Sequence, residues 1–306
     1  MKVSSIALMV FFSVFLIACS KNKDVQQPSR NDQPTESLQK HTVAFNLNNF
    51  KVSYNERQAN KEVAAKDYLT ILSIVAFDSA GNHANSFIHN TVGGDMQTFG
   101  TLSLQLKPGT YTFMVEGTAK EQQQLFTDFL QLNTARLMTS LSHDDLHGSD
   151  VFYKKFTFTV ADRDTTIETV RLDRLTGLLE VQFTYTLPQN VERVDLKAYD
   201  APFSYYVNED SVRWRDSMFV GRIARNTVVD SLKVNNYFFG TSSPMTVVIK
   251  AYDKDDNFMY EKKVENVFVY RNKKTILKGK LYPSSLSIDV PVTVDSDYTD
   301  TVTQNF

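Results

Sequence analysis

The residue with the clearest chemical role in this sequence is its only cysteine, Cys19. A single thiol excludes both a disulfide framework and a zinc site built from several thiolates. Cys19 directly follows the apolar run Ile6–Ala18, which has Lys2 on its amino-terminal side. As a helix this run covers roughly 20 Å, less than the ~30 Å of a hydrocarbon layer. The run is therefore typical of a signal peptide rather than of a spanning helix.

The end of the run, Leu16-Ile17-Ala18-Cys19, resembles the lipobox of bacterial lipoproteins. This resemblance implies that a diacylglyceryl group is attached to the thiol of Cys19 and that cleavage leaves Cys19 as the first residue. A thiolate is the nucleophile suited to such a thioether bond. An ordinary secretory signal peptide with an incidental cysteine is the alternative. We predict a signal peptide over 1–18 and a flexible tether over 19–41, because the tether stretch is polar and cannot bury a core.

Other clusters of polar residues are weaker candidates for chemistry. His143 and His147 are four residues apart and could face one metal on a helix, but no third ligand is identifiable and a polar loop is favoured. Asp253, Asp255 and Asn257 imitate the start of a calcium loop, although the glycine and the bidentate glutamate that the loop needs are missing. A hairpin turn explains these acids better.

Aromatic residues gather in one segment that has no regular alternation. It contains Phe203, Tyr205 and Tyr206, followed by Trp214 between two arginines. Exposed rings there could stack on a sugar, with Trp214, Tyr205 and Tyr206 as the possible ligand-binding residues. The alternative, which we favour, is that these rings close one end of a core.

Composition and motifs argue against several classes of protein. The chain has 33 Lys+Arg against 35 Asp+Glu, whereas a nucleic-acid-binding protein needs a basic surplus. None of the common hydrolase, nucleotide-binding or metalloprotease motifs occurs. We expect no enzyme activity, no metal site and no cofactor beyond the covalent lipid on Cys19. A pair of catalytic carboxylates brought together only by folding stays open as an alternative.

After Lys40 the dominant period of the sequence is two, which predicts strands. Clear examples are His41–Phe50, Leu102–Leu106 and Phe156–Val160, separated by turn signals such as Lys107-Pro-Gly109. The stretch Lys120–Leu141 breaks this pattern, because its apolar residues have helical spacing. We predict one or two short helices there, the second beginning near Ser142.

A faint internal repeat is also present. Ala76-Phe77-Asp78 recurs as Ala198-Tyr199-Asp200, and Thr166-Ile167 recurs as Thr275-Ile276. The two offsets differ, which an insertion in the first copy before Val151 would explain. We predict two β-sandwich domains, 42–172 and 173–306, with the short helical insertion in the first.

Three segments make the chain similar to a known family: Leu106–Gly117, Arg174–Val181 and Arg271–Tyr282. Together with the lipobox and the tether, they resemble the fimbrillin superfamily of Bacteroidales, and within it the FimB-like fimbrial anchor lipoproteins. The resemblance implies a mainly β fold of two tandem transthyretin-like sandwiches without catalysis. It further implies a lipid-anchored protein of the outer membrane, exposed with the fimbria, that attaches fimbriae there.

The resemblance also implies fimbrial subunits as partners, joined by β-strand addition, in which backbone hydrogen bonds supply affinity and alternate side chains supply register. The alternating segment Leu286–Val294 is a candidate for the exchanged strand, or else the last strand of its own domain. A stalk or tip subunit is the alternative function; the stalk reading requires cleavage near Arg57. A surface lipoprotein that binds glycans is a further alternative.

Overall fold

Strands make up nearly all the regular structure of the protein, as its runs of Val, Thr, Phe and Tyr predict. The computed structural model describes residues 39–47, 49–51, 62–91, 98–119, 126–139, 148–167, 170–183, 187–225, 233–280, 291–292 and 304–305. Within these ranges the only helix is α1 (Ala65–Tyr68), and no helix is long and apolar enough to cross a membrane. The prediction of a mainly β protein is confirmed.

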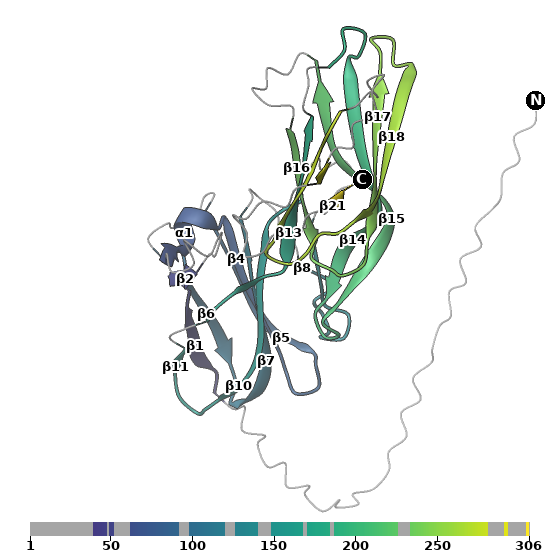
Figure 1. The fold of residues 1–306 in the computed structure, drawn as a ribbon. Coiled ribbons are helices and arrows are strands. Elements are labelled where there is room, and N and C mark those ends of the chain that lie inside the picture. Colours follow the sequence, from purple (N-terminus) through teal and green to yellow (C-terminus); the bar gives the residue numbers. More distant parts are fainter. Residues whose placement is uncertain are drawn as a thin grey trace, which may run out of the picture. The chain divides into compact units, whose positions relative to one another are not determined.

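Two sheets enclose the core of the first half of the protein (Figure 1). One sheet has the strand order β11 (Thr165–Ile167), β1 (His41–Asn46), β6 (Thr101–Leu106). The other has the order β12 (Asp173–Arg174), β10 (Val151–Val160), β7 (Gly109–Thr118), β4 (Ile71–Phe77), β5 (His83–Asn90). Phe45 of β1 packs on Phe113 of β7 with ring centroids 5.1 Å apart, so apolar side chains of the two sheets meet between them.

The second half is built in the same way. A sheet of β16 (Lys233–Phe239), β13 (Thr176–Phe183) and β19 (Lys274–Gly279) shares a core with a larger sheet. The larger sheet has the order β18 (Phe258–Val267), β17 (Met245–Tyr252), β14 (Arg193–Tyr206), β9 (Arg136–Met138), β8 (Phe126–Thr127), and β15 (Ser211–Ala224) pairs with β14. Two short pairs complete the described strands: β2 (Asn49–Lys51) with β3 (Glu62–Ala64), and β20 (Pro291–Val292) with β21 (Gln304–Asn305).

The strand pairing repeats between the halves. In the first half β1 pairs parallel with β11 and antiparallel with β6; in the second, β13 pairs parallel with β19 and antiparallel with β16. Likewise β4 lies between β5 and β7, and β14 lies between β15 and β17. The recurring dipeptides Thr166-Ile167 and Thr275-Ile276 occupy the equivalent strands β11 and β19. The observed topology therefore agrees with the repeat read from the sequence.

The two copies differ most between β7 and β10, where the first half carries residues 119–150 and the second half has only the turn 253–257. The prediction of helices is wrong for the described part of this insertion, 126–139, which forms β8, turns and β9. Leu137 of β9 is fully buried, and β9 pairs with the end of β14. This contact with a distant strand outweighs the local helical spacing. Residues 120–125 and the helix start expected near Ser142 lie outside the described residues.

A third core joins the first half to the second. Strand β4 is buried along its whole length, with Ile74 in the core of the first half and Val75 in the third core. The other buried members of the third core come from both halves of the chain: Phe77, Met114, Ala135, Leu137, Val151, Tyr153, Leu175, Tyr205, Val207 and Phe239. The halves therefore pack within one compact unit, 38–306.

A buried ion pair lies beside this third core. The carboxylate of Asp150 and the guanidinium of Arg174 are 3.0 Å apart, and both side chains are almost fully buried. The hydroxyls of Tyr68 and Thr176 donate to the two carboxylate oxygens at 2.8 and 2.6 Å, and Arg174 donates to Asn272 at 3.0 Å. Burial raises the pKa of Asp150, and Arg174 opposes this effect. Four separate segments thus meet on one charge pair.

Close packing at the junction also requires a glycine. A Cβ at Gly177 would lie 2.2 Å from the carbonyl oxygen of Tyr270, so the backbone of β13 approaches the β18–β19 connection more closely than any side chain allows. The neighbours of Gly177 also hold the junction: Leu175 lies in the third core and Thr176 binds Asp150. The segment Arg174–Gly177, part of a motif singled out in the sequence, is therefore the link between the halves.

We expect Arg174→Met to lower the free energy of unfolding by about 3–5 kcal/mol, because it leaves the Asp150 carboxylate buried without its counter-charge. The matched control is Lys154→Met, which breaks the exposed Lys154–Asp173 pair, also at 3.0 Å, on the neighbouring residues of β10 and β12. This control is expected to cost less than about 1 kcal/mol. Denaturant unfolding measures both, and equal losses would contradict a special role for the buried pair.

Candidate functional site

The first of the described strands, β1, lies at the centre of its sheet, with a neighbouring strand on each side. It forms six residue pairs with β6 and three with β11. Val43, Phe45 and Leu47 are at most 1% exposed, and Phe45 contacts Phe156 as well as Phe113. We call the place between β6 and β11 the β1 seat. A strand here gains two hydrogen-bonding edges and a set of apolar pockets, which is the chemistry of strand addition.

Polar contacts hold the outer end of β1 in the seat. The Nε2 atom of His41 lies 2.7 Å from a carboxylate oxygen of Asp162, and the backbone N–H of Thr42 donates to Asp164 at 2.7 Å. Both aspartates belong to the turn between β10 and β11. The entry of the chain into β1 is thus fixed at this turn, at the end of the stretch predicted to be the tether.

The aromatic segment that the sequence predicted to be irregular is a regular hairpin, and that prediction is wrong. Strands β14 and β15 pair along almost their full length (Figure 1). Register shifts at Leu196/Lys197 and Pro202/Ser204, and a positive φ of 51° at Asp200, interrupt the alternation. Bulges of this kind admit Pro202 within a strand and hide the period of two.

This hairpin separates the three possible ligand-binding residues rather than bringing them together. Trp214 of β15 is 42% exposed. Tyr206 is half-buried under the guanidinium of Arg213, 4.9 Å from the ring centroid. Tyr205 is only 3% exposed and lies in the third core, so its ring offers no free face to a sugar. Of the three, Trp214 alone presents a large exposed apolar surface.

Tyr205 instead belongs to a polar and aromatic cluster at the junction. Its hydroxyl donates to Asp210, which also pairs with Arg271 at 3.3 Å, and its ring packs on Tyr153 and Phe239. Burial raises the pKa of Tyr205, and the hydrogen bond to Asp210 raises it further. Both effects favour the neutral phenol, which is the form that donates the hydrogen bond. These contacts give Tyr205 a structural role at the junction between the halves.

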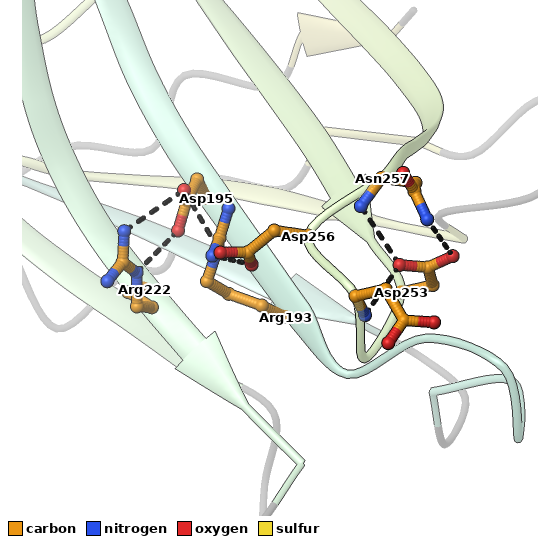
Figure 2. Close-up of polar contacts among 7 residues, drawn as sticks. Arg193, Asp195, Arg222, Asp253, Asp256 and Asn257 are labelled. Atoms are coloured by element: carbon orange, nitrogen blue, oxygen red, sulfur yellow. Dashed lines mark hydrogen bonds and ion pairs between the residues drawn. The ribbon is translucent and has the colours of Figure 1, made fainter.

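Asp253 forms the turn that the sequence analysis preferred to a calcium loop (Figure 2). One of its carboxylate oxygens accepts the backbone N–H groups of Asp255 and Asn257, each at 2.9 Å, and the other accepts the Asn257 side chain at 3.0 Å. Asp78 makes the same backbone contacts with Ala80 and Asn82 in the β4–β5 turn. The two hairpins therefore share an Asp-x-x-x-Asn turn, whose fourth residue has a positive φ in both copies.

An ion-pair network lies next to the Asp253 turn, as Figure 2 shows. The carboxylate of Asp195 in β14 accepts hydrogen bonds from two nitrogens of Arg222 in β15, at 2.6 and 3.2 Å. It also forms an ion pair with Arg193. Arg193 pairs in turn with Asp256 and lies 4.2 Å from the centroid of the Tyr252 ring. The hydrogen bond to Asp195 raises the pKa of Arg222. The network ties the β17–β18 turn to the beginning of β14.

Several residues predicted to matter lie outside the described residues. These are Cys19, Arg57, His143 and His147. Of the candidate exchange strand Leu286–Val294, only Pro291–Val292 is described, as β20. Among the residues that are described, no group of three or more His, Cys, Asp or Glu side chains is arranged to hold a metal ion.

The Asp150–Arg174 pair was not predicted from the sequence. Its one signal was Arg174 at the start of the motif Arg174–Val181. Nothing in the local pattern identifies Asp150 as its partner, because the carboxylate precedes β10 in an irregular segment. The later part of β14, from Asp200 onward, and all of β15 were missed for a similar reason, since the bulges remove the alternation that predicts strands.

Comparison with known proteins finds similarity at the level of structure. No protein-family model matches the chain, and no curated protein matches it in sequence. A candidate polysaccharide-binding protein (DUF1812) from Bacteroides thetaiotaomicron is similar over 87% of this chain and 98% of its own, with 12% identity and a TM-score of 0.53. At that identity the likeness shows a shared fold.

Fimbrial proteins of Porphyromonas gingivalis are also among the structural neighbours. The anchor protein Mfa2 has 16% identity and a TM-score of 0.46, over 78% of this chain and 90% of its own. The tip protein Mfa3 has 12% identity and a TM-score of 0.41, over 87% of this chain and all of the compared one. Both neighbours are fimbrial proteins.

We expect Tyr205→Ala to lower the free energy of unfolding by about 3–5 kcal/mol, as large-to-small changes in a core do. Trp214→Ala, on the other strand of the same hairpin, is expected to cost no more than about 1 kcal/mol, because its ring is already partly in water. Chemical denaturation compares the two. A larger loss for Trp214→Ala would contradict this assignment of the two rings.

The Asp253 turn should not respond to calcium. Hydrogen bonds from the Asn257 side chain, then from its backbone, lower the pKa of Asp253. Because the folded-state pKa lies below the unfolded value, the stability that this carboxylate adds is present above pH ~4 and lost as the pH falls through the folded-state pKa. We expect Asp253→Ala to lower the Tm at pH 7, with a smaller loss at pH 2. A rise in the Tm of the unmodified protein with calcium would contradict the turn assignment.

Proposed function

We propose that this protein is a lipid-anchored assembly protein that attaches fimbriae to the outer membrane, without catalytic activity. In this proposal residues 1–18 are the signal peptide, Cys19 carries the lipid, and 19–41 is the tether. Residues 42–172 and 173–306 are two tandem transthyretin-like sandwich domains. The partners are fimbrial subunits joined by strand addition, and the protein is exposed at the cell surface with the fimbria.

The observation that carries this proposal is the occupied β1 seat. Strand β1 begins at His41, the last residue of the predicted tether, and its apolar side chains fill the pockets of the first half. A subunit in the middle of a polymer must present a seat for the strand of its neighbour. A chain whose own first strand fills the seat, and whose amino-terminal side leads to a lipid, is suited to one end of the polymer. The uncleaved chain therefore has the arrangement that an anchor needs.

The stalk alternative requires removal of β1. Cleavage near Arg57 would release β1 together with the tether and the lipidated Cys19, because both precede that residue. The seat would then lie open between β6 and β11, with Phe113 and Phe156 exposed where Phe45 now packs. Cleavage that opens the β1 seat therefore also removes the lipid anchor.

A second candidate function is glycan binding. Two observations favour it: the candidate polysaccharide-binding protein that shares the fold, and the exposed ring of Trp214. An exposed indole is a suitable surface for the apolar face of a sugar. Retention of the protein on immobilised polysaccharide, lost in the folded Trp214→Ala variant, would support this function. Absence of retention by the unmodified protein would eliminate it.

We expect Cys19→Ser to abolish incorporation of labelled palmitate and to release the protein from the membrane fraction. Because one thioether and its acyl chains provide the attachment, the loss should be complete rather than partial. Fimbriae should then be found detached in the medium, which electron microscopy of cells and supernatant measures. Ser20→Ala, next to the lipidated residue, is the matched control and should leave both attachment and labelling unchanged.

Two results would contradict the anchor. Fimbriae that stay attached to cells carrying Cys19→Ser would show that the lipid does not hold them. A mature chain that begins at Gln58, determined by amino-terminal sequencing, would show that β1 and the lipid are removed, and would favour the stalk subunit.

A further inference from the structure

Strand β1 has a defined orientation relative to the predicted tether. The tether enters the first half at His41, beside Asp162 and Asp164 of the β10–β11 turn. This turn follows Val160, the last residue of β10. The junction with the second half lies at the other end of β10, where the backbone N–H of Leu175 donates to the carbonyl of Val151 at 2.9 Å. The tether and the junction therefore lie at opposite ends of the strands of the first half.

Force applied between the tether and the second half must consequently run along β1. A pull on His41 draws β1 lengthwise out of its seat, while the junction holds the rest of the first half at the far end. All the pairs of β1, six with β6 and three with β11, are then strained at the same time. A pull across the sheet would instead strain these pairs one after another, beginning at His41.

We propose that β1 is a shear-loaded strand, through which this protein carries tension between the membrane and a partner held on the second half. The tension itself rests on the proposed anchor function, whereas the dependence of strength on direction follows from the pairing alone. Simultaneous loss of many ladder hydrogen bonds makes forced unfolding slow, and forced unfolding is governed by that rate.

Side-chain packing adds to the resistance. Val43, Phe45 and Leu47 alternate into the core, so sliding β1 along its axis removes all three from their pockets together. A slip by one residue gives no relief, because it would turn every one of these side chains away from the core. A slip by an odd number of residues therefore offers no register in which the strand could rest.

The second half offers the same geometry at β19. β19 pairs parallel with β13 over six residue pairs, from Leu178 with Lys274 to Phe183 with Gly279. The backbone N–H of Asn272, just before β19, donates to Thr176 at the junction, so Gly279 lies at the end remote from it. A partner that pulls on the chain beyond Gly279 would load β19 along its axis as well.

Single-molecule pulling on the mature, unlipidated chain tests the proposal. The thiol of Cys19, the only cysteine, is one attachment point. In the shear geometry the second point is Lys254→Cys, in the β17–β18 turn of the second half, where the side chain is 80% exposed. In the peeling geometry it is Arg163→Cys, an exposed position in the turn beside His41. Both variants are expected to fold, with equal Tm values in bulk solution.

We expect the first unfolding event to need a several-fold higher force with the Lys254→Cys attachment than with Arg163→Cys at the same pulling rate. In the peeling geometry β1 should detach first, which releases the chain from His41 to Asn49, where β2 begins. Equal forces in the two geometries would overturn the proposal, even where Cys19→Ser releases fimbriae from cells. A large difference would uphold the shear geometry, even where fimbriae stay attached to cells carrying Cys19→Ser and the anchor function fails.

Discussion

The buried pair of Asp150 and Arg174 holds the segments on which both halves of this protein depend. Asp150 immediately precedes β10, Arg174 lies in β12, and Thr176, which also binds Asp150, begins β13. Removing either charge would leave the other in an environment without water, which is far more costly than the pair itself is stabilising. The pair therefore acts mainly through specificity: the start of the second half has one position relative to the end of the first.

The third core supplies the apolar contacts at the junction between the halves. Because β4 is buried on both faces, the larger sheet of the first half serves two cores, and the insertion 119–150 supplies β9 to the sheet of the second half. A repeat that would otherwise give two independent sandwiches thus becomes one compact unit. Tension that enters at one end can pass to the other through packed side chains rather than through a single linking strand.

The β1 seat connects the fold to the proposed function. A strand held between two neighbours contributes its whole length of hydrogen bonds and its buried face to the first half. The same arrangement decides what the chain can do in a polymer, because a filled seat cannot accept a partner strand. One covalent detail, whether β1 stays joined to the rest, therefore separates an anchor from a stalk subunit with the same sandwich fold.

The sequence by itself determined what depends on neighbouring residues. Alternation of apolar residues gave most strands, and the spacing of Asp253 and Asn257 identified a turn, because one carboxylate can satisfy backbone N–H groups two and four residues away. The signal run and Cys19 are local patterns of the same kind. Only the tertiary structure decided that 126–139 would form strands and turns, that Tyr205 would be buried while Trp214 stays exposed, and that Asp150 would meet Arg174. Each of these depends on contacts between segments far apart in the chain, where burial and strand pairing outweigh local preference.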